Sequence, residues 1–236
     1  MVDKSDDRVR AMFGEIAPKY DRVNHLLSCN VDRYWRWKTV RKVNPAGEQP
    51  ILDVCAGTGD LAFAFHKKCR GRVPVIAADF CPEMLAIGEQ KRDNLGIEES
   101  SLKFVEADTQ QLPFESDRFQ VVSVGFGLRN VSDTMQGLRE MVRVCCPGGR
   151  VAILEFSMPR WQPFKAIYGW YFRNVLPRIG QWLARNDHSA YNYLPESVSE
   201  FPSGLEMVKL LKEAGLQEAR CHAFTGGVAS LYVGVK

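Results

Sequence analysis

The sequence predicts an α/β fold built on a mainly parallel sheet, and three observations support this prediction. Short β-rich runs alternate with segments of helical periodicity, which is the pattern that βαβ units produce. The first run ends in a glycine-rich turn, "ILDVCAGTGD" at residues 51–60. Two more β-rich runs surround Gly226-Gly227 near the end of the sequence, which is typical of a hairpin. Five strands before the hairpin and two within it give a sheet of seven.

The elements are expected in a regular order. Residues 1–48 are polar, contain aromatic residues and have a helical pattern. Strands are then expected at Ile51–Cys55, Val73–Ala78, Leu102–Ala107, Phe119–Val124 and Gly149–Glu155. Helices are expected between them at Leu61–Cys69, Pro82–Asn94 and Asp133–Cys146. A helix near Ser203–Ala214 leads into the hairpin strands "LQEARCHAF" and "VASLYVGVK", so that residues 1–236 form one domain.

Residues 158–200 break this alternation after the fifth strand. The segment contains Pro163, Gly169, Pro177 and Gly180, which are expected to prevent one long helix. We interpret it as a helical cap that is inserted into the sheet domain.

Composition narrows the class of protein. The 236 residues can bury a large core, and 45% hydrophobic with 25% charged residues is ordinary for a soluble globular protein. A net charge of +3 is too small to indicate a nucleic-acid partner. The charged start "MVDKSDDRVR" is unlike a secretory signal, and no apolar run approaches the roughly 18 residues of a membrane span.

The seven cysteines are odd in number and contain no CxxC pair. Several lie in apolar runs, and Cys145 and Cys146 are adjacent. We therefore expect a reduced, cytoplasmic protein whose cysteines are small core residues, with no zinc or other metal site.

The glycine turn predicts a binding site for a nucleoside. Asp53 lies in a strand of the buried type, and Gly57 and Gly59 follow it, with Ala62 completing a GxGxxG/A motif. Gly57 would permit the tight turn, and Gly59 would let a ligand approach the backbone. Asp79, at the end of the next strand, could accept both hydroxyls of a ribose. The glycines alone are also compatible with an ordinary strand–helix turn.

The motif does not by itself separate NAD(P) from S-adenosylmethionine. A dinucleotide would place its pyrophosphate at the helix N-terminus, where Asp60 would repel it. S-adenosylmethionine carries an ammonium and a sulfonium, which Asp53 and Asp60 would attract. The acidic neighbours therefore favour a methyl donor.

Several longer segments carry a family signature. They are "IAPKYDRVNHLLSCNVDRYW", "VGFGLRNVSD", "RVCCPGGRVAILEFSMP", "YNYLPESVSEFPSGLEMVKLLKEAGL" and "GGVASLYVGVK". Together they resemble the ubiquinone/menaquinone biosynthesis C-methyltransferases over almost the whole chain. Val23 and Asp32 stand where that family often has Met and His, so Asp32 is given no catalytic role.

The resemblance implies a class I S-adenosylmethionine-dependent methyltransferase with a Rossmann-like fold. It also implies methylation of a ring carbon of a prenylated quinol, in menaquinone synthesis (demethylmenaquinol to menaquinol), in ubiquinone synthesis or in both. Asp79 would then bind the ribose, and Asp108 and Thr109 would lie against the adenine. The expected donor-binding residues are Asp53, Gly57, Thr58, Gly59, Asp79, Asp108, Thr109 and Gly125.

A carbon acceptor must be activated before it can attack the methyl group. If the ring hydroxyl resembles a phenol, its pKa is about 10, and ionising it near pH 7 costs roughly 4 kcal/mol. Arg129, just after the fourth strand, is the expected catalytic group, either stabilising the quinolate or holding a proton-accepting water. Asn130 would orient the substrate. The alternative for Arg129 is a structural arginine that binds loop carbonyls.

Tyr20 and Asp21 belong to the N-terminal signature, which implies a catalytic role in contact with donor or substrate. On chemistry alone, a packed tyrosine beside a helix-capping aspartate is the leading interpretation. In the cap, His188, Tyr191 and Tyr193 could contact the substrate, move a proton or simply pack. No role is assigned to the other histidines.

Two segments combine basic and aromatic residues. The cap has five Lys or Arg and no acid between Phe156 and Asn186, and seven aromatic residues lie among them. The second segment is "DRYWRWKTVRK". One hypothesis is an apolar entrance that docks peripherally on the inner face of a membrane. The other is a solvated face whose aromatics pack on the domain or on a second copy of the chain.

Two other functions stay open from the sequence. A NAD(P)-dependent oxidoreductase would need a catalytic set such as Tyr-x-x-x-Lys, which "YGWYF" and "YNYLP" do not supply. A non-catalytic quinone-binding protein of the same fold would keep the glycine turn. A hydrolase is disfavoured, because the sequence has no GxSxG motif.

Overall fold

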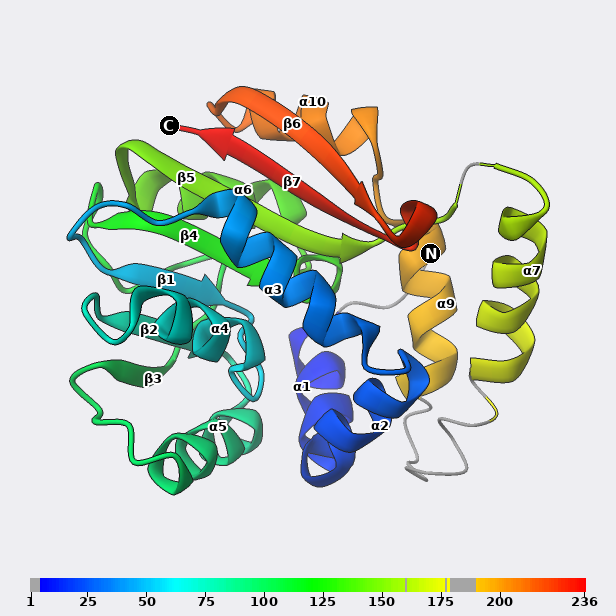
Figure 1. Ribbon diagram of the computed structural model, residues 1–236, viewed down its shortest axis with the longest axis horizontal. Coiled ribbons are helices and arrows are strands. Elements are labelled where there is room, and N and C mark those ends of the chain that lie inside the picture. Colours follow the sequence, from blue (N-terminus) through cyan, green and yellow to red (C-terminus); the bar gives the residue numbers. More distant parts are fainter. Residues whose placement is uncertain (1–4, 160, 177, 179–189) are drawn as a thin grey trace.

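The computed structural model describes residues 5–159, 161–176, 178 and 190–236 (Figure 1). At its centre is a seven-stranded sheet with the order β3-β2-β1-β4-β5-β7-β6, in which β7 runs antiparallel to its neighbours. The strands are β1 Ile51–Val54, β2 Val75–Asp79, β3 Leu102–Glu106, β4 Phe119–Gly125, β5 Cys145–Phe156, β6 Gln217–Phe224 and β7 Ala229–Val235. The expected α/β fold, mostly parallel sheet and C-terminal hairpin are confirmed.

Helices cover both faces of the sheet and create two apolar cores. β1 contributes to both, because Ile51 belongs to one core and Leu52 and Val54 belong to the other. The helices on the Ile51 face are α3 Val31–Val43, α4 Asp60–Cys69 and α5 Pro82–Asn94, and those on the opposite face are α6 Thr134–Val144 and α10 Leu205–Glu213.

The carboxyl ends of the central strands bring the polar residues of the expected site together. In the parallel register, Asp53 of β1 lies beside Ala77 of β2 and Ser123 of β4. The chain order reverses between β1 and β4, which is where open α/β sheets bind their ligands. The fold therefore places the glycine turn at the usual position of a ligand site.

Two expected boundaries are wrong, one by two residues and the other by four. The helix expected to reach Cys146 ends at Val144, and β5 begins at Cys145 rather than Gly149. Cys145 already pairs with Phe119, and the ladder shifts register just beyond this pair. The segment "CCPGG" is therefore an irregular part of the strand, although its local pattern resembles a helix end and a turn.

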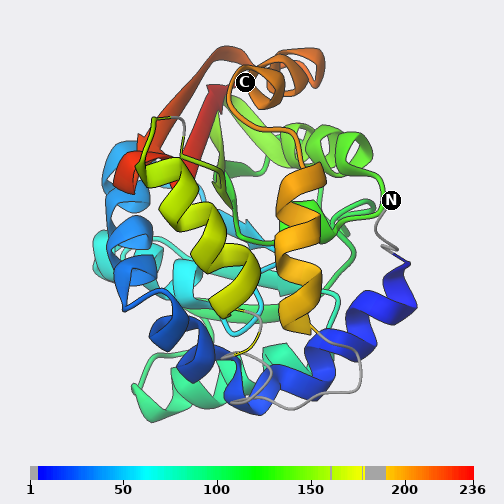
Figure 2. The ribbon, with the colours of Figure 1, turned by 90° about the vertical axis from the view of Figure 1, so that its right-hand side faces the viewer.

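The N-terminal helices and the cap lie together at the carboxyl end of the sheet (Figures 1 and 2). Their side chains form a third apolar cluster, in which Met12 and Ile16 meet Phe172. Figure 2 shows α7 and α9 side by side, with α1 and α2 below them. The helical elements of this region are α1 Asp6–Ile16, η1 Ala17–Lys19, α2 Tyr20–Leu27, α7 Phe164–Trp170, η3 Tyr171–Val175 and α9 Ala190–Glu200. Two short helical turns lie elsewhere in the fold, η2 Leu128–Asn130 and η4 Thr225–Gly227.

Gly169 does not interrupt the cap helix as expected. α7 passes through it and continues into η3. Gly169 is buried, and a Cβ there would make an ordinary contact of 3.5 Å with the methyl group of Met158, so neither space nor backbone conformation demands glycine at this position. Pro163 directly precedes α7, whereas Pro177 and Gly180 lie outside the described residues.

The cysteines are more varied than expected. Cys81 and Cys145 are buried, but Cys29 and Cys221 are exposed and are not core residues. Among the helices that the structure describes, none combines the length and the apolar character that crossing a bilayer requires.

We expect only glycine to fit at position 88 of α5, because a Cβ there would lie 2.2 Å from Cε1 of the Phe104 ring. Gly88→Ala should lower the free energy of unfolding by about 1–3 kcal/mol through overpacking, although alanine is the better helix former. Chemical denaturation would measure the change. Adding Phe104→Leu should recover part of the loss, and an unaltered or raised stability of Gly88→Ala would contradict the expectation.

Candidate active site

The glycine turn has the backbone geometry that its sequence indicates. Gly57 and Gly59 have positive φ angles of 56° and 85°. The amide of Gly57 donates to Oδ2 of Asp79 at 2.7 Å, which ties the turn to the end of β2. The reason expected for Gly59 needs correction. A Cβ there would lie 2.7 Å from Cζ of Phe104, so the protein's own ring excludes a side chain.

A cavity lies beside this turn, at the carboxyl ends of β1, β2 and β4. Its lining brings together seven of the expected donor-binding residues, Asp53, Gly57, Thr58, Asp79, Asp108, Thr109 and Gly125. Asn130 also lines it, and Tyr20 closes it from the N-terminal side. Gly59 does not line it. We call this space the donor cavity.

Burial perturbs the two central carboxyl groups of the donor cavity. It raises the pKa of Asp53 to about 7 and the pKa of Asp79 to about 6. Ser123 donates to Oδ1 of Asp53 at 2.7 Å, whereas Oδ2 is buried without a hydrogen-bond partner in the described chain. Asp79 accepts from the amides of Gly57 and Cys81. A cationic ligand would complete this arrangement.

The other lining residues make local contacts. Asp108 accepts from the amide of Gln110 at 2.8 Å, and the hydroxyl of Thr109 lies 3.2 Å from the sulfur of Cys55. These contacts fix the segment after β3 as one wall of the donor cavity. The expected contact of this segment with adenine stays a prediction.

A second cavity, of about 350 Å³, lies between the N-terminal helices and the cap. Its wall is mostly aromatic and aliphatic, and the charged residues among its described lining are Asp32, Arg36 and Arg129. Tyr20, Arg36 and Phe126 line both cavities, so the two spaces meet there. Burial raises the pKa of Tyr20 to about 12. We call this space the apolar cavity.

Arg129 combines both roles that its position suggested. Its side chain is buried and lines the apolar cavity. Its Nη1 donates to the carbonyl of Phe126 and lies 3.1 Å from Oε2 of Glu155, as a structural arginine would. Its Nε is buried without a partner in the described chain. Asn130 lines the donor cavity instead.

Of the three cap residues singled out in the sequence, the structure places one. Tyr193 is 5% exposed and lines the apolar cavity. His188 and the side chain of Tyr191 lie outside the described residues.

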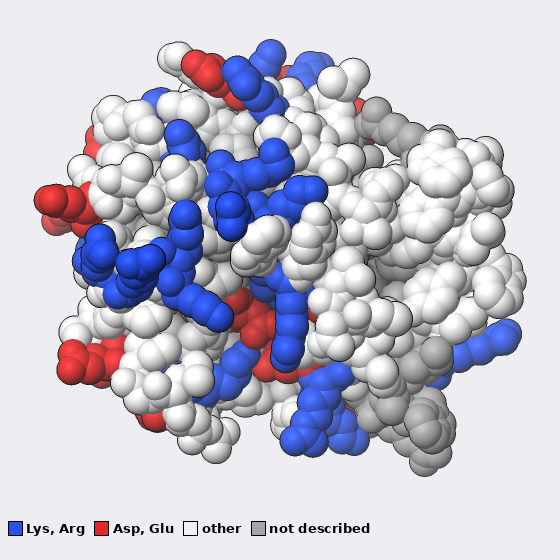
Figure 3. Space-filling view, in the orientation of Figure 1, with Lys and Arg blue, Asp and Glu red and all other residues white. Residues whose placement is uncertain are grey.

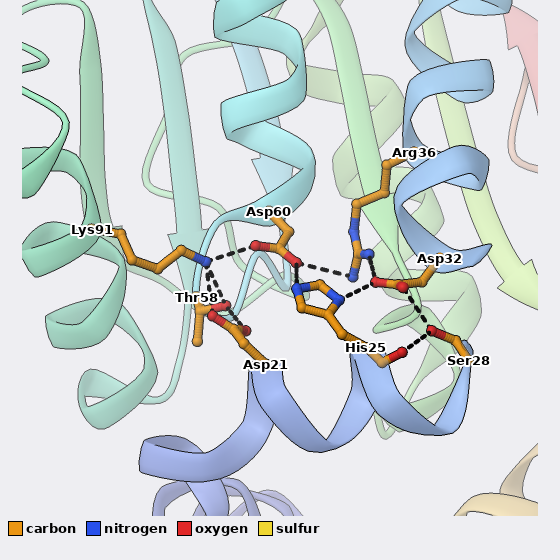
Figure 4. Close-up of polar contacts among 8 residues, drawn as sticks. All are labelled: Asp21, His25, Ser28, Asp32, Arg36, Thr58, Asp60 and Lys91. Atoms are coloured by element: carbon orange, nitrogen blue, oxygen red, sulfur yellow. Dashed lines mark hydrogen bonds and ion pairs between the residues drawn. The ribbon is translucent and has the colours of Figure 1, made fainter. Parts of the chain in front are cut away.

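An ion network covers the glycine turn from the N-terminal side (Figure 4). Lys91 of α5 donates to Oδ1 of Asp60 at 2.6 Å and to Oδ2 of Asp21 at 2.9 Å. Thr58 donates to Asp21 at 2.6 Å, and Nη2 of Arg36 lies 3.5 Å from Oδ2 of Asp60. Burial opposes ionisation of Asp60, but the charges of Arg36 and Lys91 hold its pKa below the usual value.

These contacts change what we expected of the two acids. Asp60 is balanced by cations of the protein itself, so it attracts a cationic donor less than the sequence indicated. Asp21 lines neither cavity, and its carboxylate binds Thr58 and Lys91. Its geometry suits closing α2 over the turn rather than touching the reacting atoms.

Sequence reasoning missed His25 and Arg36 and left Asp32 without a role. Nδ1 of His25 lies 2.7 Å from Asp32, Nε2 lies 3.7 Å from Asp60, and Ser28 donates to Asp32 at 2.6 Å. The two acids and His25 are close enough to share a metal ion, but Arg36 already pairs with both carboxylates. The departure from the family signature at Asp32 was the available signal.

Comparison with known proteins identifies the family. The model of the ubiE/COQ5 methyltransferase family matches residues 1–236. The chain belongs to this family. A ubiquinone/menaquinone biosynthesis C-methyltransferase UbiE of Geobacter sp. (strain M21) is 41% identical, with 100% of this chain and 99% of that protein covered. A demethylmenaquinone methyltransferase of Bacillus subtilis (strain 168) is 38% identical, with 100% of both chains covered.

Solved structures share the fold of this ubiE/COQ5 protein. A SAM-dependent methyltransferase of Thermotoga maritima has a TM-score of 0.66 at 14% identity, covering 95% of this chain and 98% of its own. Family membership and this fold together make the protein a class I S-adenosylmethionine-dependent methyltransferase, so the oxidoreductase alternative is set aside. The donor cavity fits this cofactor, because the open acceptor of Asp53 and the acidic Asp79 suit its positive charges and hydroxyls.

Binding of S-adenosylmethionine should release protons between about pH 6 and 7, the range of the raised pKa values of Asp79 and Asp53. The donor's cations favour the ionised carboxylates and lower both pKa values, so affinity should rise as pH rises through this range. Calorimetry in buffers of different ionisation enthalpy measures the released protons. Asp53→Asn should reduce the release and weaken binding about tenfold, whereas Thr109→Val should keep the release. Equal heats in all buffers would contradict this.

Proposed function

We propose that this ubiE/COQ5 methyltransferase methylates a ring carbon of a prenylated quinol, in menaquinone synthesis (demethylmenaquinol to menaquinol), in ubiquinone synthesis or in both. The observation that carries the proposal is the apolar cavity, which meets the donor cavity at Tyr20, Arg36 and Phe126. An apolar space beside a methyl donor suits an aromatic ring with an apolar tail. The names of the Geobacter and Bacillus relatives support the same substrate class.

When bound, S-adenosylmethionine supplies the methyl group: its S–C bond breaks with the electron pair on sulfur as the ring carbon forms the new C–C bond, and the ring carbon then loses its proton to water. The protein must hold the two reactants in line and make the ring electron-rich. Tyr20 keeps its proton, with a pKa of about 12, and can donate a hydrogen bond to a ring oxygen. Arg129, which lines the apolar cavity, offers its positive charge to the developing oxyanion. Asn130, on the donor side, orients the ring.

A turnover assay tests this function. Purified protein would be incubated with methyl-labelled S-adenosylmethionine and, separately, with reduced demethylmenaquinone and with the reduced demethylated benzoquinone of ubiquinone synthesis. We expect label on the ring carbon of at least one product. Label in one assigns the pathway, and label in both means a shared enzyme. Donor binding without label in either product would contradict the proposal and favour a non-catalytic quinone-binding protein.

We further propose that the protein works in the cytoplasm and meets its substrate at the inner face of a membrane. Figure 3 shows a mostly uncharged face over the cap with Lys or Arg at its lower edge, and further Lys and Arg side chains gathered beside it over α3. On the cap, Trp161, Ile167 and Trp170 are 57%, 62% and 60% exposed. On α3, the exposed rings of Tyr34 and Trp37 stack with centroids 5.8 Å apart. Apolar and cationic side chains on one face suit an anionic lipid surface.

Removing cap charges should weaken binding to vesicles that contain phosphatidylserine. The double variant Lys165→Gln, Arg173→Gln removes two exposed cations. Each contributes about 1 kcal/mol to the free energy of membrane binding, so the partition coefficient onto vesicles should fall roughly thirtyfold. Co-sedimentation with vesicles measures it, and Lys209→Gln with Lys212→Gln on α10 is the matched control. Equal binding of both variants would overturn the membrane contact. A dimer that the cap variant converts to a monomer would indicate a second copy of the chain on this face instead.

A further inference from the structure

Arg36 lies where the donor cavity and the apolar cavity meet. Its side chain is 14% exposed and lines both spaces. The guanidinium carbon lies 5.6 Å from the ring centre of Phe126, which also lines both. A fixed positive charge is therefore enclosed at the point where a donor and an acceptor must meet.

Most hydrogen-bond donors of this guanidinium are available for a ligand. An arginine has five N–H donors. Within the described part of the chain, Arg36 gives one hydrogen bond, from Nη1 to Oδ2 of Asp32, and Nη2 lies 3.5 Å from Oδ2 of Asp60. By contrast, Nη1 of Arg129 is already bound to the carbonyl of Phe126 and to Glu155.

Groups on several helices fix the orientation of Arg36 (Figure 4). Asp32 accepts from Arg36 and Ser28, so its carboxylate is itself held in place. Asp60 is held in the same way by Lys91. In the described part of the chain, the charged and titratable groups around the guanidinium are Asp32 on its own helix, His25 and Tyr20 on α2, Asp60 on α4, Asp53 on β1, Arg129 in η2 and, through Asp60, Lys91 on α5.

We propose that Arg36 and Asp32 together bind one ring hydroxyl of the acceptor, an inference that rests on the proposed function. Both residues line the apolar cavity. A hydroxyl is both donor and acceptor, so its O–H donates to the carboxylate of Asp32 while its oxygen accepts from the guanidinium of Arg36. As the hydroxyl proton moves onto the carboxylate of Asp32 and the oxygen gains negative charge, the hydrogen bond from Arg36 to that oxygen becomes stronger. Arg36 is then a catalytic residue that touches the substrate.

The same pair would distinguish the reduced ring from the oxidised one. A quinone carbonyl has no O–H, so it could accept from Arg36 but could donate nothing to Asp32. Asp32 already accepts from Arg36 and Ser28, so a bound quinone would lose one hydrogen bond without leaving the carboxylate unpaired. The pair therefore favours the quinol form by that one hydrogen bond.

A chromophoric phenol tests the contact directly. 4-Nitro-1-naphthol absorbs visible light when ionised, so absorbance reports the ionisation of the bound probe. The wild type should ionise the bound probe at a lower pH than free solution does. Arg36→Gln should lose this shift and lower kcat/KM for reduced demethylmenaquinone by roughly 10–1000-fold, as loss of an oxyanion donor does. Arg36→Lys should retain part of both.

Two further variants separate binding from support. Lys91→Met breaks the same network at Asp60 and Asp21 but does not line the apolar cavity. It should change donor affinity and the unfolding temperature, but the bound probe should still ionise at a lower pH than in free solution, because Arg36 and Asp32 keep their own pairing. Arg139→Gln, an exposed arginine on α6, should change nothing.

The outcomes also separate this role from the proposed function. One outcome excludes hydroxyl binding. In it, Arg36→Gln alters donor affinity and the unfolding temperature as Lys91→Met does, but the bound probe still ionises at a lower pH than in free solution. Arg36 would then only support the network. No shift in the wild type excludes it as well. If the wild type shifts the probe but methylates neither quinol, the hydroxyl site stands and the proposed substrate is wrong.

Discussion

The ion network centred on Asp60 and Lys91 is the constraint on which both cavities depend. It joins side chains from four helices, α2, α3, α4 and α5, around the first turn after the glycine motif. Tyr20 stands beside Asp21 at the start of α2 and lines both cavities. A displacement of α2 would therefore open both cavities at once. The roof of the site is held by directed charge pairs as well as by the apolar contacts of Met12 and Ile16.

Such a network fixes the relative position of the helices and adds little to the free energy of folding. The side chains of its members range from 6% exposed for Asp32 to 28% for Lys91, so each lost part of its hydration on folding. The desolvation of partly buried charges costs about as much as their pairing returns. Apolar surfaces can slide against one another, whereas a carboxylate shared by two cations fixes one relative position of the helices. A reaction that depends on the alignment of two bound molecules needs such a fixed arrangement.

The sequence revealed the parts of this site that are local. Strand, glycine turn and helix follow one another in the chain, so the cluster of Asp53, Gly57 and Asp79 could be predicted from spacing and strand order. The pairing of His25 with Asp32 and of Arg36 with Asp60 could not, because it depends on how α2 and α3 dock on α4. Gly59 shows the same limit, since the ring of Phe104 that fills its Cβ position comes from β3, far along the chain.

The contrast between the two cavities suits the chemistry of methyl transfer. A sulfonium and an ionised quinol carry opposite charges, and both charges disappear as the methyl group moves. A water-poor, apolar cavity favours a step in which charge is lost, because the transition state needs less solvation than the reactants. The same cavity makes it harder to form the quinol anion, and enclosed guanidinium groups offset that cost. A buried arginine, Arg129, and a half-buried one, Arg36, beside Phe126 in a cavity otherwise lined mainly by apolar side chains are therefore what this reaction requires.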